Sequence, residues 1–220
     1  MGKVNRFWIV VSAVAALCLV SAGAADKPPV TRAQALKFIT QASAQERLAG
    51  VTRLAEIGTM ADADLLVPVL RDGNAQVRFV ATAAMWQIWS RSGDAAIDGL
   101  YQRGMEQLES SRLEEALAIF TEIIQRKPSF AEGWNKRATL HYLMGNFELS
   151  LKDCDEVIKR NRNHFGALSG YGQIYLNLGD QEKALQYFEK ALAVNPNLPG
   201  AAVTIRQLQE QLREKRRKTI

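Results

Sequence analysis

The sequence predicts an all-α protein built as a right-handed solenoid of helical hairpins. Apolar residues recur at helical spacing along most of the chain, and between residues 97 and 198 the pattern repeats with a period of 34 residues. A fixed period of this size indicates stacked repeats, because each helical pair can bury its apolar face only against its neighbours. A second repeat, of different period, precedes it. The 47% of hydrophobic residues is enough for such a core.

The 34-residue repeat is clearest in LGDQEKALQYFEKALAVNP (178–196), which aligns with residues 144–162 and with a stretch that ends at Pro128. Gly145 and Gly179 mark the turn inside a hairpin, where a left-handed residue is needed. Pro128 and Pro196 end a hairpin, since proline cannot continue a helix. Two other columns hold small residues, which let two helices touch: Gly104, Ala138 and Gly172, and Ala116, Ser150 and Ala184. A further column holds bulkier residues, which fill the space between pairs: Phe120, Cys154 and Phe188.

These columns resemble the tetratricopeptide repeat (TPR) family, which implies three repeats at about residues 97–130, 131–164 and 165–198. The third repeat follows the family pattern most closely. The middle copy departs from it, with His141 at an aromatic position, Cys154 in place of Phe and Arg162 in place of the closing Pro. We expect looser packing there. Residues 199–220 read as a capping helix followed by a basic tail.

The amino-terminal segment, residues 30–93, contains a repeat with an offset of 31 residues, in which Arg47 aligns with Arg78. A short apolar helix precedes each copy, within ALKFITQA (35–42) and DLLVPVLRDG (64–73). The segment resembles HEAT-like helical repeats, in which such an arginine ties down the loop of its neighbour. Trp86 and Trp89 share one helix face, and we expect them to pack this segment onto the first TPR helix near Leu100. The alternative is an exposed anchor, a second candidate face for a partner.

The first 24 residues have the three parts of a secretory signal peptide. Lys3 and Arg6 precede an apolar run over residues 7–20, and Ala22 and Ala24 form a small-residue cleavage pattern. The run is shorter than the roughly 20 residues that span a bilayer. We therefore predict an exported protein, periplasmic or secreted, cleaved near Ala24 or Ala25. An uncleaved inner-membrane anchor is the alternative.

The net charge of +5 is a property of the two ends of the chain. Loss of residues 1–24 lowers it to +3, and the last eight residues, REKRRKTI, carry +4. This distribution argues against a nucleic-acid partner, which needs basic residues gathered on a folded surface. For the tail we expect at most weak contact with a membrane surface. Cys154 alone remains after cleavage, so no internal disulfide is expected and it reads as a buried small hydrophobe.

No catalytic, metal or cofactor site is expected from the sequence. His141 and His164 are the only histidines, and neither has an evident helper in the sequence. Metal-binding, dinucleotide-binding, acyl-transfer and nucleotide-binding motifs are absent from it. Acidic pairs such as Asp153 and Asp155 read as exposed helix surface.

The TPR resemblance implies that the first helix of each pair lines a concave groove that binds an extended peptide or a helix. Carried over by column, the groove residues are Tyr101, Met105 and Leu108; Asn135, Thr139 and Tyr142; Ser169, Gln173, Leu176 and Asn177; and Val203 and Gln207 of the cap. Family members that capture a terminal carboxylate use Lys, Arg and Asn at such positions. Here only Asn135 fits, so this mode of capture is not expected.

We therefore expect a non-catalytic scaffold or assembly factor of the bacterial cell envelope that binds a protein partner in the TPR groove. The alternatives are a self-associating structural protein, forming a homo-oligomer, and a membrane-anchored regulator if the amino terminus is not cleaved.

Overall fold

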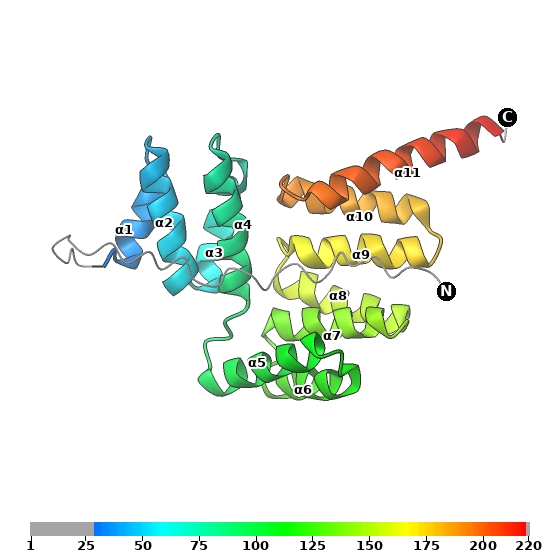
Figure 1. Ribbon diagram of the computed structural model, residues 1–220, viewed down its shortest axis with the longest axis horizontal. Coiled ribbons are helices and arrows are strands. Elements are labelled where there is room, and N and C mark those ends of the chain that lie inside the picture. Colours follow the sequence, from blue (N-terminus) through cyan, green and yellow to red (C-terminus); the bar gives the residue numbers. More distant parts are fainter. Residues whose placement is uncertain (1–28, 219–220) are drawn as a thin grey trace. The chain divides into compact units, whose positions relative to one another are not determined.

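The computed structural model describes residues 29–218, so the predicted signal segment lies outside the described residues. The helices belong to one compact unit, Thr31–Ile220, and no strand occurs between residues 29 and 218. The predicted all-α fold of helical hairpins is confirmed (Figure 1). Within the same range, no helix is both long enough and apolar enough to cross a membrane.

The amino-terminal helices form two layered pairs. They are α1 (Arg32–Phe38), α2 (Ala44–Ile57), α3 (Met60–Leu66), the 3₁₀ helix η1 (Pro68–Arg71) and α4 (Ala75–Trp89). Helix α2 packs on α1 and on α4, and α4 also packs on α3 and η1. The prediction of a single helix within residues 64–73 is wrong. The segment is divided between α3 and η1, because Pro68 has no N–H to donate to an α-helical hydrogen bond.

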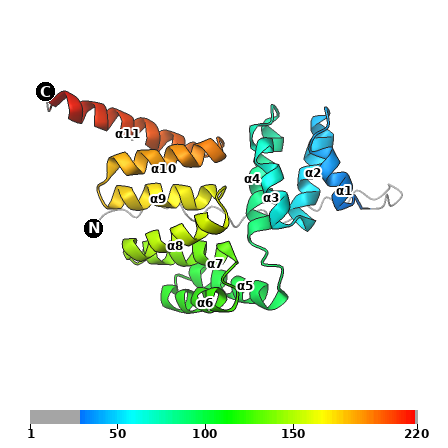
Figure 2. The same ribbon diagram turned by 180° about the vertical axis from the view of Figure 1, so that it is seen from behind.

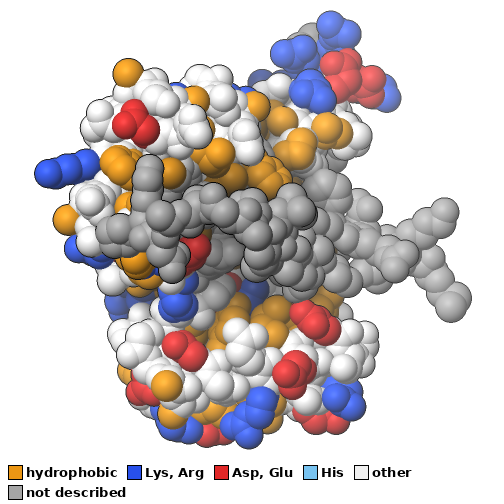
Figure 3. All heavy atoms as spheres, turned by 60° about the vertical axis from the view of Figure 1, so that its left-hand side comes forward, with side chains coloured by type: hydrophobic (Ala, Val, Ile, Leu, Met, Phe, Trp, Pro, Cys, Tyr) orange, Lys and Arg blue, Asp and Glu red, His pale blue; other side chains and the backbone are white. Residues whose placement is uncertain are grey.

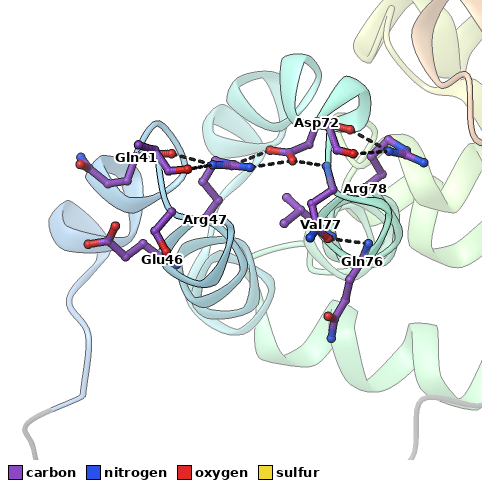
Figure 4. Close-up of polar contacts among 11 residues, drawn as sticks. Gln41, Glu46, Arg47, Asp72, Gln76, Val77 and Arg78 are labelled. Atoms are coloured by element: carbon purple, nitrogen blue, oxygen red, sulfur yellow. Dashed lines mark hydrogen bonds and ion pairs between the residues drawn. The ribbon is translucent and has the colours of Figure 1, made fainter.

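Arg47 and Arg78 occupy equivalent places in the two pairs, as the 31-residue offset predicts (Figure 4). The Arg47 guanidinium donates to both carboxylate oxygens of Asp72, at 2.5 and 2.9 Å, and to the carbonyls of Gln41 and Ala42. Arg78 donates to the carbonyl of Asp72 at 2.8 Å. Asp72 therefore joins the two arginines, and each arginine ties down a loop. The resemblance to the HEAT family itself stays a prediction.

Three antiparallel hairpins follow, one for each predicted TPR, and the first begins two residues before its predicted bound. The helices are α5 (Ala95–Glu109) and α6 (Leu113–Arg126), α7 (Ala131–Leu143) and α8 (Phe147–Arg160), and α9 (Phe165–Asn177) and α10 (Gln181–Val194). Each hairpin packs on the next, and α11 (Pro199–Lys218) packs on α10 (Figures 1 and 2). Buried Ala201, Ile205, Leu208 and Leu212 give α11 its packed face, while its basic last turn is exposed.

The small residues let the two helices of a hairpin touch, as the sequence predicts, but the bulky residues that they meet belong to the same hairpin and do not lie only between pairs. A Cβ atom at Gly104 would lie 2.8 Å from the Phe120 ring, and one at Gly172 would lie 2.8 Å from Phe188. In the middle repeat Ala138 packs with the smaller Cys154, which is 2% exposed. The predicted burial of Cys154 is confirmed. The two helices of this repeat therefore stay in contact through an Ala and Cys pair, where the other repeats have a Gly and Phe pair.

Candidate protein-binding groove

Most of the predicted groove residues retain an accessible surface. Asn177, Val203 and Gln207 are exposed, and Met105, Leu108, Thr139, Tyr142, Ser169, Gln173 and Leu176 are half-buried. They lie on α5, α7, α9 and α11, the first helix of each pair and the cap. Asn177 Nδ2 donates to the Tyr142 hydroxyl over 3.0 Å, which joins the second and third repeats across this surface. All of these side chains are uncharged.

Tyr101 and Asn135 differ from the expectation, because they are only 4% and 5% exposed. The Tyr101 ring packs edge-on against Phe120 and Phe130. Its hydroxyl lies 3.5 Å from Ser90 Oγ, just beyond α4. Asn135 Nδ2 donates to Glu132 Oε1 over 2.9 Å. Neither side chain is available to a partner while these contacts hold.

A buried charged cluster lies beneath α4, and sequence reasoning missed it. Both carboxylate oxygens of Glu132 are used: Oε1 is 3.1 Å from Lys136 Nζ, and Oε2 is 2.9 Å from His164 Nε2. His164 Nδ1 accepts from the Ala167 N–H, so the proton lies on Nε2, which donates to Glu132. The expectation that His164 lacks a helper is therefore wrong. Its partner is 32 residues away in sequence, where no local pattern reveals it.

The cluster holds Glu132 as a carboxylate. Burial alone raises the pKa of this carboxyl, but the Lys136 ammonium and the hydrogen bonds from His164 and Asn135 outweigh it and lower the pKa to about 2. Burial likewise lowers the pKa of Lys136, but Tyr101 and Glu132 outweigh it, and the net shift is upward. The Tyr101 pKa is raised by burial. The arrangement is a satisfied ion pair in a protein interior.

The ring contacts of Trp86 and Trp89 are with the third repeat, whereas the expectation placed the pair on the first TPR helix near Leu100. The Trp89 ring stacks on His164 with centroids 4.4 Å apart, and Trp86 meets Phe165 edge-on at 5.3 Å. Both contacts are with the start of the third repeat. Trp89 is 2% exposed, so the pair does not form an exposed anchor. The Trp86 ring approaches so closely that a Cβ atom at Gly166 would lie 2.3 Å from it.

The turns between repeats also bind the amino-terminal helices. Asn195 and Asn197 precede α11, and Asn161 and Asn163 stand one period earlier, before α9. Asn163 Nδ2 donates to Asp64 Oδ1 at 2.9 Å, and Asn197 Nδ2 donates to the Leu70 carbonyl at 2.6 Å. Asn195 Nδ2 donates to Thr82 Oγ1 at 3.3 Å. This repeated Asn-x-Asn turn is a sequence signal that could have pointed to the contact, in addition to the two tryptophans.

The acidic surface expected at Asp153 is also corrected. Asp153 is 4% exposed, and both of its carboxylate oxygens accept from Arg137, at 2.7 and 2.8 Å. Its neighbour Asp155 is exposed and accepts from the Tyr171 hydroxyl. His141 Nε2 lies 3.8 Å from Asp153, and the pKa of His141 is lowered by burial. Within residues 29–218 no group of three or more metal-binding side chains comes together.

Residues 101–157 and 165–198 each match the tetratricopeptide repeat family. A TPR repeat-containing protein of Rhizobium etli is 38% identical over 124 residues, which cover 56% of this chain and 61% of that protein. The Hsp70-Hsp90 organizing protein 1 of Glycine max is 25% identical over 52% of this chain and 20% of its own length. The chain thus spans less than two thirds of these relatives.

Solved structures share the fold. The first TPR of Spaghetti (RPAP3) has a TM-score of 0.51 at 22% identity, over 53% of this chain and 92% of that one. A MamA protein has a TM-score of 0.51 at 16% identity, over 71% and 86%. The molecule is a helical-repeat protein. Over the matched residues it belongs to the tetratricopeptide repeat family.

Proposed function

We propose that this chain is a non-catalytic scaffold that binds a partner peptide or helix on the concave face of its TPR array. The observation that carries the proposal is the row of uncharged, accessible side chains along α7, α9 and α11. Thr139, Gln173 and Gln207 offer hydroxyl and amide groups, and Leu176 and Val203 offer apolar contact. Hydrogen bonds to a peptide backbone combined with apolar contacts are a common mode of peptide recognition.

Helix α4 limits the groove to its carboxyl-terminal part. The buried side chains of Tyr101 and Asn135 lie beneath the contact between the amino-terminal helices and the repeats. A partner on this face therefore contacts the second and third repeats and the cap. The neutral lining favours an uncharged or apolar segment over a terminal carboxylate.

The similar proteins support protein binding as the general activity. The Spaghetti TPR domain was solved with an HSP90 peptide, and the TPR2B domain of yeast Sti1, with a TM-score of 0.50, was solved in a complex with pHsp70. At 22% and 20% identity these structures establish the fold alone. We therefore infer the chemistry of the partner from the groove residues of this chain.

The place of action that we propose is the bacterial cell envelope. The signal-peptide pattern of residues 1–24 and the Rhizobium etli relative support this proposal. Intact mass of the protein recovered from a periplasmic extract tests it. Loss of about 24 residues supports export with cleavage, whereas full length supports the membrane-anchored alternative.

A nucleic-acid or self-association role has less support. Among the side chains that are visible in Figure 3, Lys and Arg are mixed with Asp and Glu over most of the face. Among the described residues, large hydrophobic side chains that are exposed lie at 60, 65, 79, 143, 149, 178 and 203, and so none is on α5 or α6 at the start of the array.

The groove is tested by comparative capture from envelope extract. One variant combines Thr139→Ala, Gln173→Ala and Gln207→Ala; the control combines Gln102→Ala, Lys152→Ala and Glu182→Ala, at exposed positions outside the groove. Both variants must keep wild-type helicity and melting temperature. We expect the same captured protein with wild type and control, and at least about tenfold less with the groove variant, which corresponds to about 1.4 kcal/mol. Equal capture by all three proteins contradicts the groove assignment.

A further inference from the structure

An open pocket of about 470 Å³ lies between α8, α9 and α10, and it shares no residue with the groove. Its lining is mainly apolar, from Ile158, Leu168, Tyr171, Tyr187, Ala193 and Val194, with Asp155, Arg162 and Lys190 as its charged members. Tyr171 and Tyr187 stack with ring centroids 4.4 Å apart, so one wall is a rigid aromatic surface. The volume lies in the range of pockets that hold small ligands or single large side chains.

One repeat earlier, the corresponding place holds the chain's own Trp134. This side chain lines a smaller open pocket of about 360 Å³ together with Arg137, Asp153 and Glu156, the counterparts of Tyr171, Tyr187 and Lys190. The indole N–H donates to the carbonyl of Pro128 over 2.9 Å. The guanidinium groups of Arg137 and Arg160 lie 5.0 and 4.7 Å from the ring centroid, in cation–π range. The ring also packs against the buried cluster of Ala131, Val157 and Ala167.

The four residues that define the Trp134 site map onto the pocket with the 34-residue period. Leu168 stands for Trp134, Tyr171 for Arg137, Val194 for Arg160 and Arg162 for Pro128. All four of these counterparts line the pocket. Leucine is smaller than tryptophan and valine is shorter than arginine, and the pocket of the third repeat is the larger one, at about 470 Å³ against 360 Å³. The third repeat therefore has more room beside the position at which the second repeat carries an indole.

The charges at the pocket favour an acidic ligand. Arg162 and Lys190 are exposed, and the Lys190 ammonium lies 4.5 Å from the Tyr187 ring centroid, where it can also face an incoming ring. The single acid, Asp155, already accepts from the Tyr171 hydroxyl. The two cations thus outnumber the one acid.

We propose that this pocket is a second partner-binding site, which takes a tryptophan side chain from an acidic segment of another protein. The indole stacks on Tyr187 and Leu168, its N–H faces the carbonyl of Arg162 as that of Trp134 faces Pro128, and flanking carboxylates pair with Arg162 and Lys190. The site is independent of the groove, since the two share no residue.

The probe is the peptide acetyl-Asp-Trp-Asp-amide, titrated into ¹⁵N-labelled protein and followed by amide chemical shifts. We expect saturable shifts at Leu168, Tyr171 and Tyr187 with a Kd of about 1 mM or tighter. Acetyl-Asp-Ala-Asp-amide tests the indole, and acetyl-Lys-Trp-Lys-amide tests the charge. Each of these control peptides is expected to bind at least tenfold more weakly.

Two variants decide whether the pocket is the site. Leu168→Trp places the chain's own indole there and is expected to abolish probe binding, whereas Leu178→Trp, at a position that is 48% exposed, leaves it unchanged. Lys190→Glu alters only the surface and is expected to weaken the acidic peptide while sparing the lysine peptide, so the proposal remains testable if Leu168→Trp does not fold. Unchanged binding in Leu168→Trp or Lys190→Glu, equal binding of the alanine peptide, or no saturable shift overturns the proposal.

Discussion

At the residue scale, the hairpin turn of the first repeat carries a local strain that the other two repeats avoid. Ser111 has φ of 57°, while Gly145 and Gly179, in the same column, have φ of 78°. A left-handed backbone costs a residue with a Cβ atom about 1 kcal/mol, and glycine avoids this cost. The sequence has glycine at this turn in two repeats, and the structure shows the same left-handed backbone at Ser111 in the first repeat.

We predict that Ser111→Gly stabilises the protein by about 0.5–1 kcal/mol, because relief of strain exceeds the added entropy of the unfolded chain. Chemical denaturation measures the change. Ser110→Gly is the matched control, since Ser110 has a negative φ of −80° and gains nothing from glycine. A stabilisation of equal size in both variants contradicts the argument from φ.

A second prediction at this scale concerns acid stability. The pKa of Glu132 is about 2 in the folded protein against an ordinary value of 4.5. A depressed folded pKa gives stability that is complete above the unfolded pKa and is lost as the pH falls from about 4.5 toward 2. The contribution is on the order of 3 kcal/mol for a shift of this size.

Glu132→Gln removes this titration and leaves the Lys136 ammonium without its carboxylate. We expect the variant to be less stable than wild type at pH 7 by a few kcal/mol, with the difference shrinking as the pH falls below 4.5. Urea denaturation between pH 3 and pH 7 measures both proteins. Since Asp72 and Asp62 also have lowered pKa values, only the difference between the proteins reports on Glu132. A difference that is constant with pH would falsify the assignment.

At the scale of the helical elements, the second repeat holds its two helices together with a different pair of side chains. Gly104 faces Phe120 and Gly172 faces Phe188 in the outer repeats. In the middle repeat, Ala138 and Cys154 share one cluster of buried residues. The larger Ala is matched by the smaller Cys, so the sequence departures in these two columns compensate for one another.

We therefore predict strong coupling between these positions. Cys154→Phe alone overpacks against the Ala138 methyl and costs about 1–3 kcal/mol, and Ala138→Gly alone costs about 1 kcal/mol. The double variant restores the Gly and Phe pair of the other repeats, so we expect a coupling energy of at least about 1 kcal/mol. Denaturation of the four proteins of the cycle measures it, and additive effects would show that the columns do not compensate.

Much of the arrangement of helices and hairpins was predictable from the sequence, because helical period, turn glycines and repeat columns are local or periodic properties. The periodic positions of Gly145, Gly179 and Pro196 placed the hairpins before any contact was known. The division at Pro68 needed only the missing N–H of proline. By contrast, the Glu132–His164 pair joins α7 to the start of α9, and the contact of Trp89 with His164 depends on how α4 runs across the repeats. No periodicity encodes that path.

At the scale of the whole molecule, the amino-terminal helices and the TPR array share one packed interface. Trp86 and Trp89 contact the start of α9. Asn163, Asn195 and Asn197 bind α3, α4 and η1 respectively. Several of these hydrogen bonds join residues about a hundred positions apart in sequence. Such a combination of aromatic packing and satisfied polar groups favours cooperative unfolding of the two segments.

Gly166 gives a direct test, because it is the point where the Trp86 ring approaches the repeat backbone. A Cβ atom there would meet Trp86 Cη2 at 2.3 Å and Cζ2 at 3.0 Å, whereas a Cβ atom at Gly99 on α5 would meet nothing within 4 Å. Both glycines are helical, so Gly99→Ala reports the gain in helix propensity without a clash. We expect Gly166→Ala to be less stable than Gly99→Ala by about 1–3 kcal/mol.

The form of the transition tests the cooperativity. Denaturation followed by far-ultraviolet circular dichroism reports all helices, and tryptophan fluorescence reports mainly the interface at Trp86 and Trp89. If the two segments form one cooperative unit, both signals shift to lower denaturant together in Gly166→Ala. A fluorescence transition that precedes the loss of helicity would show instead that α4 can leave the repeats while they remain folded, and the covered groove residues Tyr101 and Asn135 would then become accessible to a partner.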